Sequence, residues 1–169
     1  MIRASGIARL VLGVALAALS ACLPYGFAGG GLPSHIKTVA VIPFENETPS
    51  PELQREVYDA LRKGMQSRLG LREAPEAKAD ALVKGTILRY DVDVPISYSA
   101  DPRQVTSTRR RLQIAVDIQI VDQTTSKVLW ERKGLQVEGD YAERAELAGR
   151  REAIEKLIND VIEGAQSQW

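Results

Sequence analysis

The chain has 169 residues with 22 basic and 22 acidic side chains, and this zero net charge argues against a nucleic-acid-binding domain, which is usually clearly basic. A single cysteine and a single histidine exclude an intramolecular disulfide and a cluster of soft metal ligands. Because the sequence also lacks a glycine-rich phosphate loop and a Gly-x-Ser-x-Gly motif, it favours a binding or structural role over an enzyme, with no catalytic residue, metal or other cofactor expected.

The first element along the chain is an N-terminal sorting signal that ends at Cys22. Two arginines and an apolar run, residues 10–19, come before the tetrapeptide Leu-Ser-Ala-Cys. A basic start, an apolar stretch and small residues before a cysteine are typical of a bacterial lipoprotein signal. The run is shorter than the about 20 residues that a spanning helix needs. We expect residues 1–21 to be removed and Cys22 to carry diacylglyceryl on its sulfur and an acyl chain such as palmitate on its amine; a plain secretory signal is the alternative.

A lipidated linker and a single domain follow the signal. Residues 22–34 contain three consecutive glycines, which predict a flexible tether between the lipid and the domain. Residues 35–169 are enough for one domain with its own hydrophobic core.

The first half of the domain is predicted to contain a strand and a helix. Residues 36–44 are β-branched and nearly all apolar, as in a central strand that is buried on both faces. After a loop at residues 45–49, Ser50 and Pro51 are typical of a helix start and Gly70 of a helix end. Apolar residues at helical spacing predict the face that packs on the sheet. They are Leu53, Val57, Ala60, Leu61, Gly64 and Leu69.

Three further strands are predicted after this helix. Residues 81–94 and 111–122 alternate apolar with polar side chains, which indicates one buried and one polar face. An exposed connection, residues 96–106, separates them. A turn at residues 122–126 leads to a strand at residues 127–137, and the last two strands are expected to form an antiparallel hairpin.

The last predicted element is an amphipathic helix from Tyr141 or Ala142 to about Gln166. Its buried stripe is expected to consist of Leu147, Ile154, Leu157, Ile158, Val161, Ile162 and Ala165. The order β-α-β-β-β-α predicts an α/β (α+β) two-layer sandwich, in which two helices cover one face of a four-stranded, mostly antiparallel sheet.

With these elements assigned, three stretches of the chain resemble the LptE family of lipopolysaccharide-assembly lipoproteins. The first includes Cys-Leu-Pro-Tyr-Gly-Phe at residues 22–27 and Ile-Lys-Thr-Val-Ala-Val at residues 36–41. The second is Asp-Ala-Leu-Val-Lys-Gly-Thr-Ile at residues 80–87, and the third is Val-Asp at residues 121–122 with Lys-Val-Leu-Trp-Glu at residues 127–131. The ordered combination, rather than any single stretch, carries the resemblance.

The resemblance implies a lipid-anchored protein of the outer membrane that faces the periplasm of a Gram-negative-type bacterium. Such proteins are not enzymes; they lodge in a large β-barrel as plug and assembly partner, and barrel and lipoprotein together insert lipopolysaccharide into the outer leaflet. The implied partners are therefore the barrel, the membrane and lipopolysaccharide, which some family members bind directly. One alternative is an auxiliary lipoprotein subunit of another envelope transport or secretion complex. A lipid-anchored hydrolase using His35 is a third alternative, which the sparse catalytic inventory disfavours.

Four arginines are candidate ligands for lipopolysaccharide phosphates. Arg109, Arg110 and Arg111 form the densest basic cluster of the sequence, and Arg103 lies in the connection before them. Guanidinium groups match phosphate oxygens bidentately, so these residues could form a phosphate-contacting edge. The alternative is a solvated strand start whose charges prevent edge-to-edge aggregation.

Two aromatic residues are candidates for partner contact. Tyr98 lies in the predicted exposed connection, and Trp130 is either a core residue or part of a contact with the barrel. Asp91, Asp93 and Asp101 do not have the oxygen-ligand spacing of a calcium loop, and we expect them to lie on a solvated face.

Overall fold

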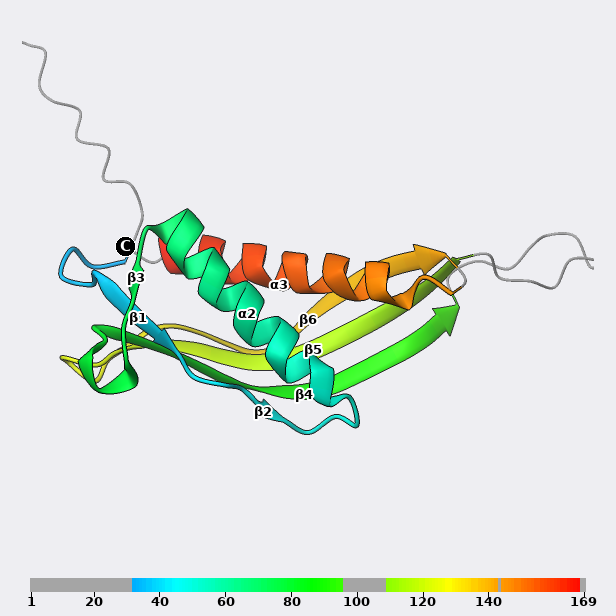
Figure 1. Cartoon of the computed structure of the whole chain (residues 1–169), viewed down its shortest axis with the longest axis horizontal. Coiled ribbons are helices and arrows are strands. Elements are labelled where there is room, and N and C mark those ends of the chain that lie inside the picture. Colours follow the sequence, from blue (N-terminus) through cyan, green and yellow to red (C-terminus); the bar gives the residue numbers. More distant parts are fainter. Residues whose placement is uncertain (1–31, 96–108, 143, 168–169) are drawn as a thin grey trace, which may run out of the picture.

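The computed structural model describes residues 32–95, 109–142 and 144–167 (Figure 1). The predictions for Cys22, Tyr98, Asp101 and Arg103 concern residues outside these ranges. Within the described ranges, no helix combines the length and the hydropathy that crossing a membrane requires.

A six-stranded mixed sheet forms one layer of the domain (Figure 1). Its strands are β1 (Thr38–Val41), β2 (Glu45–Asn46), β3 (Arg72–Glu73), β4 (Ala81–Pro95), β5 (Arg109–Asp122) and β6 (Val128–Ala142). The strand order is β3-β1-β4-β5-β6, and β2 also pairs with β4. β4, β5 and β6 are antiparallel neighbours, whereas β1 runs parallel to β3 and β4 and β2 runs parallel to β4. The prediction of four strands is therefore wrong by two.

Both additional strands contain only two residues, too few to show an alternating pattern in the sequence. Glu45 and Asn46 of β2 were expected in a loop, but they pair with Thr86 and Ile87 of β4. β3 pairs with the start of β1, and a single 3₁₀ turn, η1 (Glu76–Lys78), joins β3 to β4. These pairings depend on segments that are distant in sequence, so local periodicity does not predict them.

The predicted burial of β1 and of one face of β5 is confirmed. β1 is shorter than the predicted range, but the adjacent Val39 and Ala40 are at most 5% exposed, so both faces of the strand are covered. Alternate residues of β5 face the helices and are at most 2% exposed. They are Leu112, Ile114, Val116, Ile118 and Ile120.

The far half of β4 departs from regular alternation. Its register with β5 shifts between Asp91 and Val94, and Asp93 between them has a φ of 64°. This irregularity interrupts the expected alternation, so Val92 and Val94 are both 42% exposed. The expected continuous apolar face is therefore interrupted beyond Tyr90, which packs against the core.

Two helices cover one face of the sheet, α2 (Pro51–Leu69) and α3 (Glu146–Ser167) (Figure 1). α2 begins after Ser50 and ends at Gly70, as predicted, although the Ser50 side chain makes no capping hydrogen bond. Gly70 adopts a φ of 67° and donates its N–H to the Met65 carbonyl, which satisfies one of the last carbonyls of the helix. Buried on this helix are Leu53, Val57, Leu61, Gly64 and Met65.

α3 begins later than the sequence predicts. Tyr141 and Ala142 continue β6, where they pair with Arg110 and Arg109, and the helix starts only at Glu146. The predicted stripe is buried from Ile154 onward. Leu147 is 48% exposed, because it lies at the rim of the groove between the two helices, where no described residue covers it.

Candidate functional site

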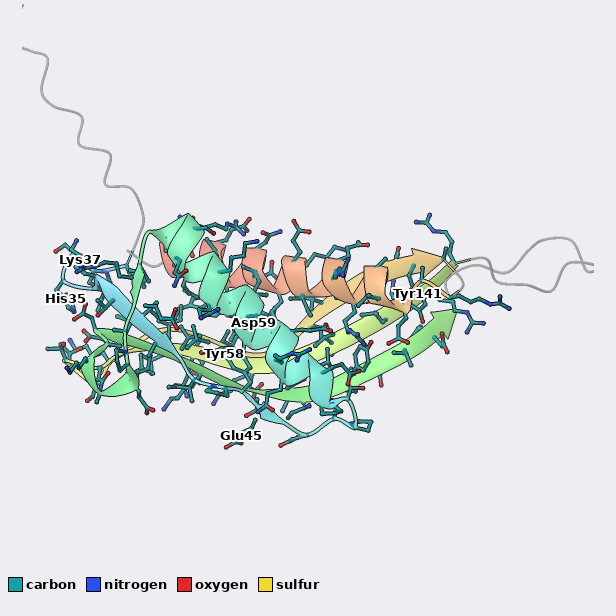
Figure 2. The ribbon with its side chains drawn as sticks, viewed as in Figure 1. His35, Lys37, Glu45, Tyr58, Asp59 and Tyr141 are labelled. Carbon is teal, nitrogen blue, oxygen red and sulfur yellow. The ribbon has the colours of Figure 1, made fainter. Side chains whose placement is uncertain are left out.

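The arginine cluster starts β5 at the end of the domain that lies away from His35. Arg110 pairs across the sheet with Tyr141, and Figure 2 shows Tyr141 and His35 at opposite ends. Successive strand residues point to opposite faces, so Arg110 lies on the same face as the buried Tyr141, whereas Arg109 and Arg111 lie on the open face. The three guanidinium groups therefore do not project from one face of the sheet.

Arg111 is held by two carboxylates of β6. Its Nε donates to Asp140 Oδ1 at 2.8 Å, and its Nη1 lies 2.9 Å from Glu138 Oε2. The hydrogen bond from Arg111 holds the pKa of Asp140 below its ordinary value. A phosphate that binds Arg111 has to compete with these two carboxylates.

Arg110 belongs to a second polar group at the same end. Its Nη1 lies 3.0 Å from Asp93 Oδ1, and the Tyr141 hydroxyl donates to the same oxygen at 2.7 Å. The Tyr141 hydroxyl also accepts the backbone N–H of Asp93 at 3.1 Å. The pKa of Asp93 is lowered mainly by the hydrogen bond from the Tyr141 hydroxyl, with a smaller contribution from Arg110. The group fixes the irregular backbone at Asp93 and gives Arg110 a structural role.

Trp130 lies in the core rather than on a contact surface. It is 5% exposed and packs against α3 at Gly164, where an added Cβ would come within 2.2 Å of the indole Nε1. The structure therefore favours the core alternative for this residue.

His35 and the strand aspartates have protein partners. His35 Nε2 lies 2.9 Å from Asp122 Oδ2, and the histidine side chain is 48% exposed. Asp91 lies 2.8 Å from Arg89. Among the described residues, no three His, Cys, Asp or Glu side chains are grouped so that they could hold a metal ion.

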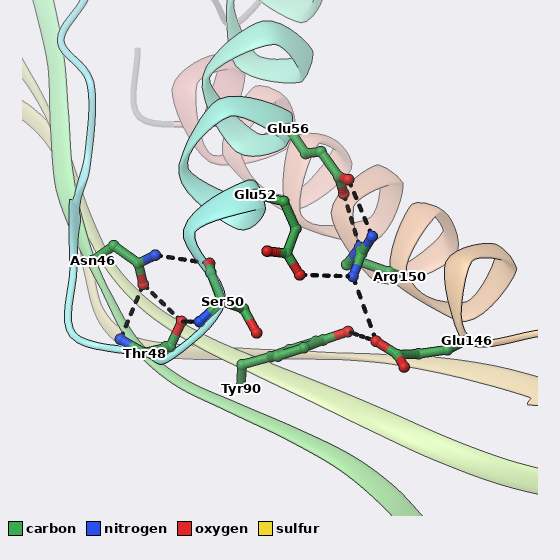
Figure 3. Close-up of polar contacts among 8 residues, drawn as sticks. All are labelled: Asn46, Thr48, Ser50, Glu52, Glu56, Tyr90, Glu146 and Arg150. Carbon is green, nitrogen blue, oxygen red and sulfur yellow. Dashed lines mark hydrogen bonds and ion pairs between the residues drawn. The ribbon is translucent and has the colours of Figure 1, made fainter.

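Sequence reasoning missed a polar cluster in which Arg150 joins α2, α3 and β4 (Figure 3). The Arg150 guanidinium binds Glu56 at 2.9 Å, Glu52 at 3.3 Å and Glu146 at 3.4 Å. The Tyr90 hydroxyl donates to Glu146 at 2.6 Å, and burial together with this bond raises the Tyr90 pKa. The four-residue spacing of Glu146 and Arg150 is visible in the sequence, but the partners on α2 and β4 are not. This cluster fixes the first turns of both helices to the sheet.

A groove of about 550 Å³ lies between the exposed sides of α2 and α3. Its apolar lining includes Ala60, Leu147, Ile154 and Ile158. Its rim carries acids and bases from both helices, so its charge does not select for an anionic ligand.

The comparisons with known proteins agree with this fold. The model of the LptE lipopolysaccharide-assembly family matches residues 36–165, which include every strand and nearly all of both helices. A comparison with curated proteins finds no match.

Several solved structures share the architecture at low sequence identity. PelC from Paraburkholderia phytofirmans, solved as a dodecamer, is 16% identical with a TM-score of 0.54, and the alignment covers 83% of this chain and 95% of PelC. The hypothetical protein CT253 from Chlamydia trachomatis is 11% identical with a TM-score of 0.52, covering 78% of this chain and 96% of CT253. XCC0632 from Xanthomonas campestris is 10% identical with a TM-score of 0.51, covering 74% of this chain and 81% of that protein. These likenesses concern the fold alone.

Proposed function

Because the chain belongs to the LptE family of lipopolysaccharide-assembly proteins, we propose that it is an outer-membrane lipoprotein that acts as plug and assembly partner of a lipopolysaccharide-inserting β-barrel. The family match over residues 36–165 carries this proposal. The lipoprotein-type signal ending at Cys22 supports the anchor. In this proposal the domain faces the periplasm and acts by binding its partners, without catalysing a reaction.

Affinity purification from detergent-solubilised outer membrane tests the proposed partner. We expect a β-barrel protein to co-purify with the tagged full chain and to be identified by mass spectrometry. An inner-membrane or secretion complex in its place would instead support the alternative role, an auxiliary lipoprotein subunit of another envelope machine.

The arginine end of the domain is the proposed site of direct lipopolysaccharide contact. Arginine forks match the phosphate groups of the lipid, and Arg109 lies exposed at the start of β5. Because Arg110 and Arg111 already contact carboxylates, phosphate binding there exchanges one anionic partner for another. Arg103 is included in this proposal on its sequence position alone.

Replacement of the four arginines by glutamine tests this contact. Glutamine avoids placing new negative charges beside Asp93, Glu138 and Asp140, so folding and binding effects can be separated. We expect weaker lipopolysaccharide binding in a pull-down assay that is run well below the melting temperature of the variant, which should fall because Arg110 and Arg111 lose their carboxylate partners. The control replaces four exposed bases elsewhere by glutamine: Lys63, Lys84, Lys133 and Arg151. Equal binding by both variants would refute the proposed contact.

A further inference from the structure

Five basic residues with exposed side chains lie at the end of the domain where the chain enters β1. Figure 1 shows the backbone segments that carry them at this end. The residues come from five separate segments: the start of β1, the end of α2, β3, η1 and the turn between β5 and β6. We call them the proximal basic patch: Lys37, Arg68, Arg72, Lys78 and Lys127. Figure 2 shows Lys37 beside His35 at this end.

Backbone hydrogen bonds and a shared cavity place these five segments next to one another. The Arg72 N–H donates to the Lys37 carbonyl at 3.0 Å, and Lys37 and Arg68 line the same small cavity. Asp80, two residues after Lys78, accepts the Lys37 N–H at 2.9 Å. The turn after β5 packs on the same place, since the N–H of its Gln123 donates to the Asp80 carbonyl at 2.8 Å. Lys127 closes that turn by accepting the Asp122 N–H at 2.8 Å.

The five basic residues outnumber the three carboxylates of these segments that form no ion pair with a lysine or an arginine, which are Glu76, Asp80 and Asp122. Asp122 is 2% exposed and contacts His35 and Thr125, while Asp80 accepts hydrogen bonds from β1. Glu73 pairs with Arg62. Glu76 is exposed, lies two residues before Lys78 and forms no ion pair among the described residues. Within residues 32–95, 109–142 and 144–167, none of the five basic residues forms an ion pair.

The distance along the chain to the proposed anchor is short. Leu32 packs against the core and Ile36 is 4% exposed, so the chain is fixed to the domain from Leu32 onward. Nine residues lie between Cys22 and Leu32, so the two Cα atoms can be at most about 35 Å apart. A lipid on Cys22 therefore keeps this end of the domain within about 35 Å of the bilayer.

We infer that the proximal basic patch lies against anionic phospholipid headgroups of the membrane that holds the anchor. This inference rests on the proposed lipidation of Cys22. A lipid chain and a group of basic residues commonly act together in membrane attachment, because the charges hold the domain at the surface after the chain has inserted.

Dye quenching on vesicles tests the inference with the purified lipidated protein. Because Cys22 is the only cysteine and its sulfur carries lipid, one introduced cysteine gives a single labelling site. Thr124→Cys places a dye beside the patch, and Ala142→Cys places one at the opposite end; both positions are exposed. The vesicles contain phosphatidylcholine, with or without phosphatidylglycerol, and a headgroup-linked quencher. We expect phosphatidylglycerol to increase quenching at position 124 and not at position 142, and added salt to reverse it.

Two charge-matched variants identify the contributing residues. The first replaces four members of the patch by glutamine, Lys37, Arg72, Lys78 and Lys127; Arg68 is kept because it binds Asn159. Each basic residue at an anionic surface changes the ratio of docked to undocked protein about fivefold, so losing four lowers this ratio on the order of a hundredfold or more. The control replaces Lys63, Lys84, Lys133 and Arg151 by glutamine and is expected to retain the quenching.

The readouts separate failure of the inference from failure of the anchor. Protein that does not float with phosphatidylcholine vesicles lacks the anchor, which overturns the proposed lipidation and the inference together. Protein that floats but shows equal quenching at position 124 in both types of vesicle overturns the inference alone. Equal loss of quenching in the two glutamine variants also overturns it, because net charge and not the patch would then be responsible.

Discussion

At the scale of single residues, Gly139 and Gly149 allow β6 and α3 to approach each other at backbone distance. A Cβ added at Gly139 would lie 1.8 Å from the Gly149 carbonyl oxygen. The conflicting atoms belong to the backbone, so a change of side-chain rotamer cannot relieve the clash. These two glycines set the spacing between the helix layer and the edge of the sheet.

We predict that Gly139→Ala lowers the free energy of unfolding by about 3 kcal/mol or more, because α3 must move off the sheet. Gly70→Ala is the matched control. A Cβ at Gly70 meets no atom within 4 Å, and its φ of 67° alone costs about 1 kcal/mol. Urea unfolding of both variants measures the difference, and equal destabilisation would contradict the close-packing explanation.

Asp122 is the charged residue most completely buried among those described, at 2% exposure. Its carboxylate accepts hydrogen bonds from the Thr125 hydroxyl at 2.6 Å and from the Thr124 N–H at 2.8 Å. His35 Nε2 also contacts this carboxylate. The Thr125 hydroxyl, the largest contributor, and the other donors outweigh burial and lower the Asp122 pKa from 3.8 to about 2. The residue thereby joins the first residues of the domain to the turn between β5 and β6.

This lowered pKa predicts how stability depends on pH. The unfolded state binds a proton at higher pH than the folded state, so the stabilisation from Asp122 is complete above 3.8 and is lost as the pH falls to about 2. Asp122→Asn should therefore be less stable than the wild type at neutral pH, and the difference should shrink across that window. Urea unfolding at a series of pH values measures it, and a constant difference would refute the assignment.

At the scale of secondary-structure elements, the Arg150 cluster determines how both helices begin on the sheet. The Arg150 side chain is 13% exposed and its three carboxylate partners are 28–45% exposed, so solvent screens the pairs only in part. Without the guanidinium, Glu52, Glu56 and Glu146 would face one another with no cation between them.

Arg150→Met is accordingly expected to lower the free energy of unfolding by about 2 kcal/mol, less than for a fully buried pair because the acids are partly solvated. The neighbouring Arg151→Met is the control, because Arg151 is exposed and forms no ion pair among the described residues, and it should change stability by no more than about 0.5 kcal/mol. Thermal unfolding compares the two. Adding Glu56→Gln to Arg150→Met should recover part of the loss; no recovery would indicate that lost packing, not repulsion, is the cause.

At the scale of the whole molecule, the two ends of the domain use their basic residues differently. Arg110 and Arg111 at one end contact Asp93, Glu138 and Asp140. The proximal basic patch at the other end forms no ion pairs within the described residues. The densest basic cluster in the sequence is therefore partly neutralised in the fold, whereas dispersed lysines and arginines combine into the more available positive surface.

Because the core lies within residues 32–167, the proposed anchor and the fold should be separable. We expect Cys22→Ala to lose outer-membrane localisation, measured by membrane fractionation, while the melting temperature of the domain stays unchanged. Tyr25→Ala, which keeps the cysteine, should retain the localisation. A Cys22→Ala protein that no longer folds would contradict the independence of anchor and core.

Local pattern accounts for the parts of the fold that the sequence predicts. The alternation from Leu112 to Ile120 repeats along one strand, and the α2 boundaries follow from Ser50, Pro51 and Gly70. Residues that are neighbours in the chain carry this information. For the candidate site, the sequence identified the cluster at residues 109–111 but not its carboxylate partners, which lie on other strands.

By itself the sequence determined the two helices, the three long strands and the family resemblance, and it predicted the lipid anchor. Only the tertiary structure decided the pairing of β2 with β4 and of β3 with β1, the late start of α3 and the exposure of Leu147. It also brought the proximal basic patch together from five segments. The physical reason is the same throughout: periodicity reports which face of an element is apolar, whereas pairing, coverage and charge clustering depend on which distant segments the fold places in contact.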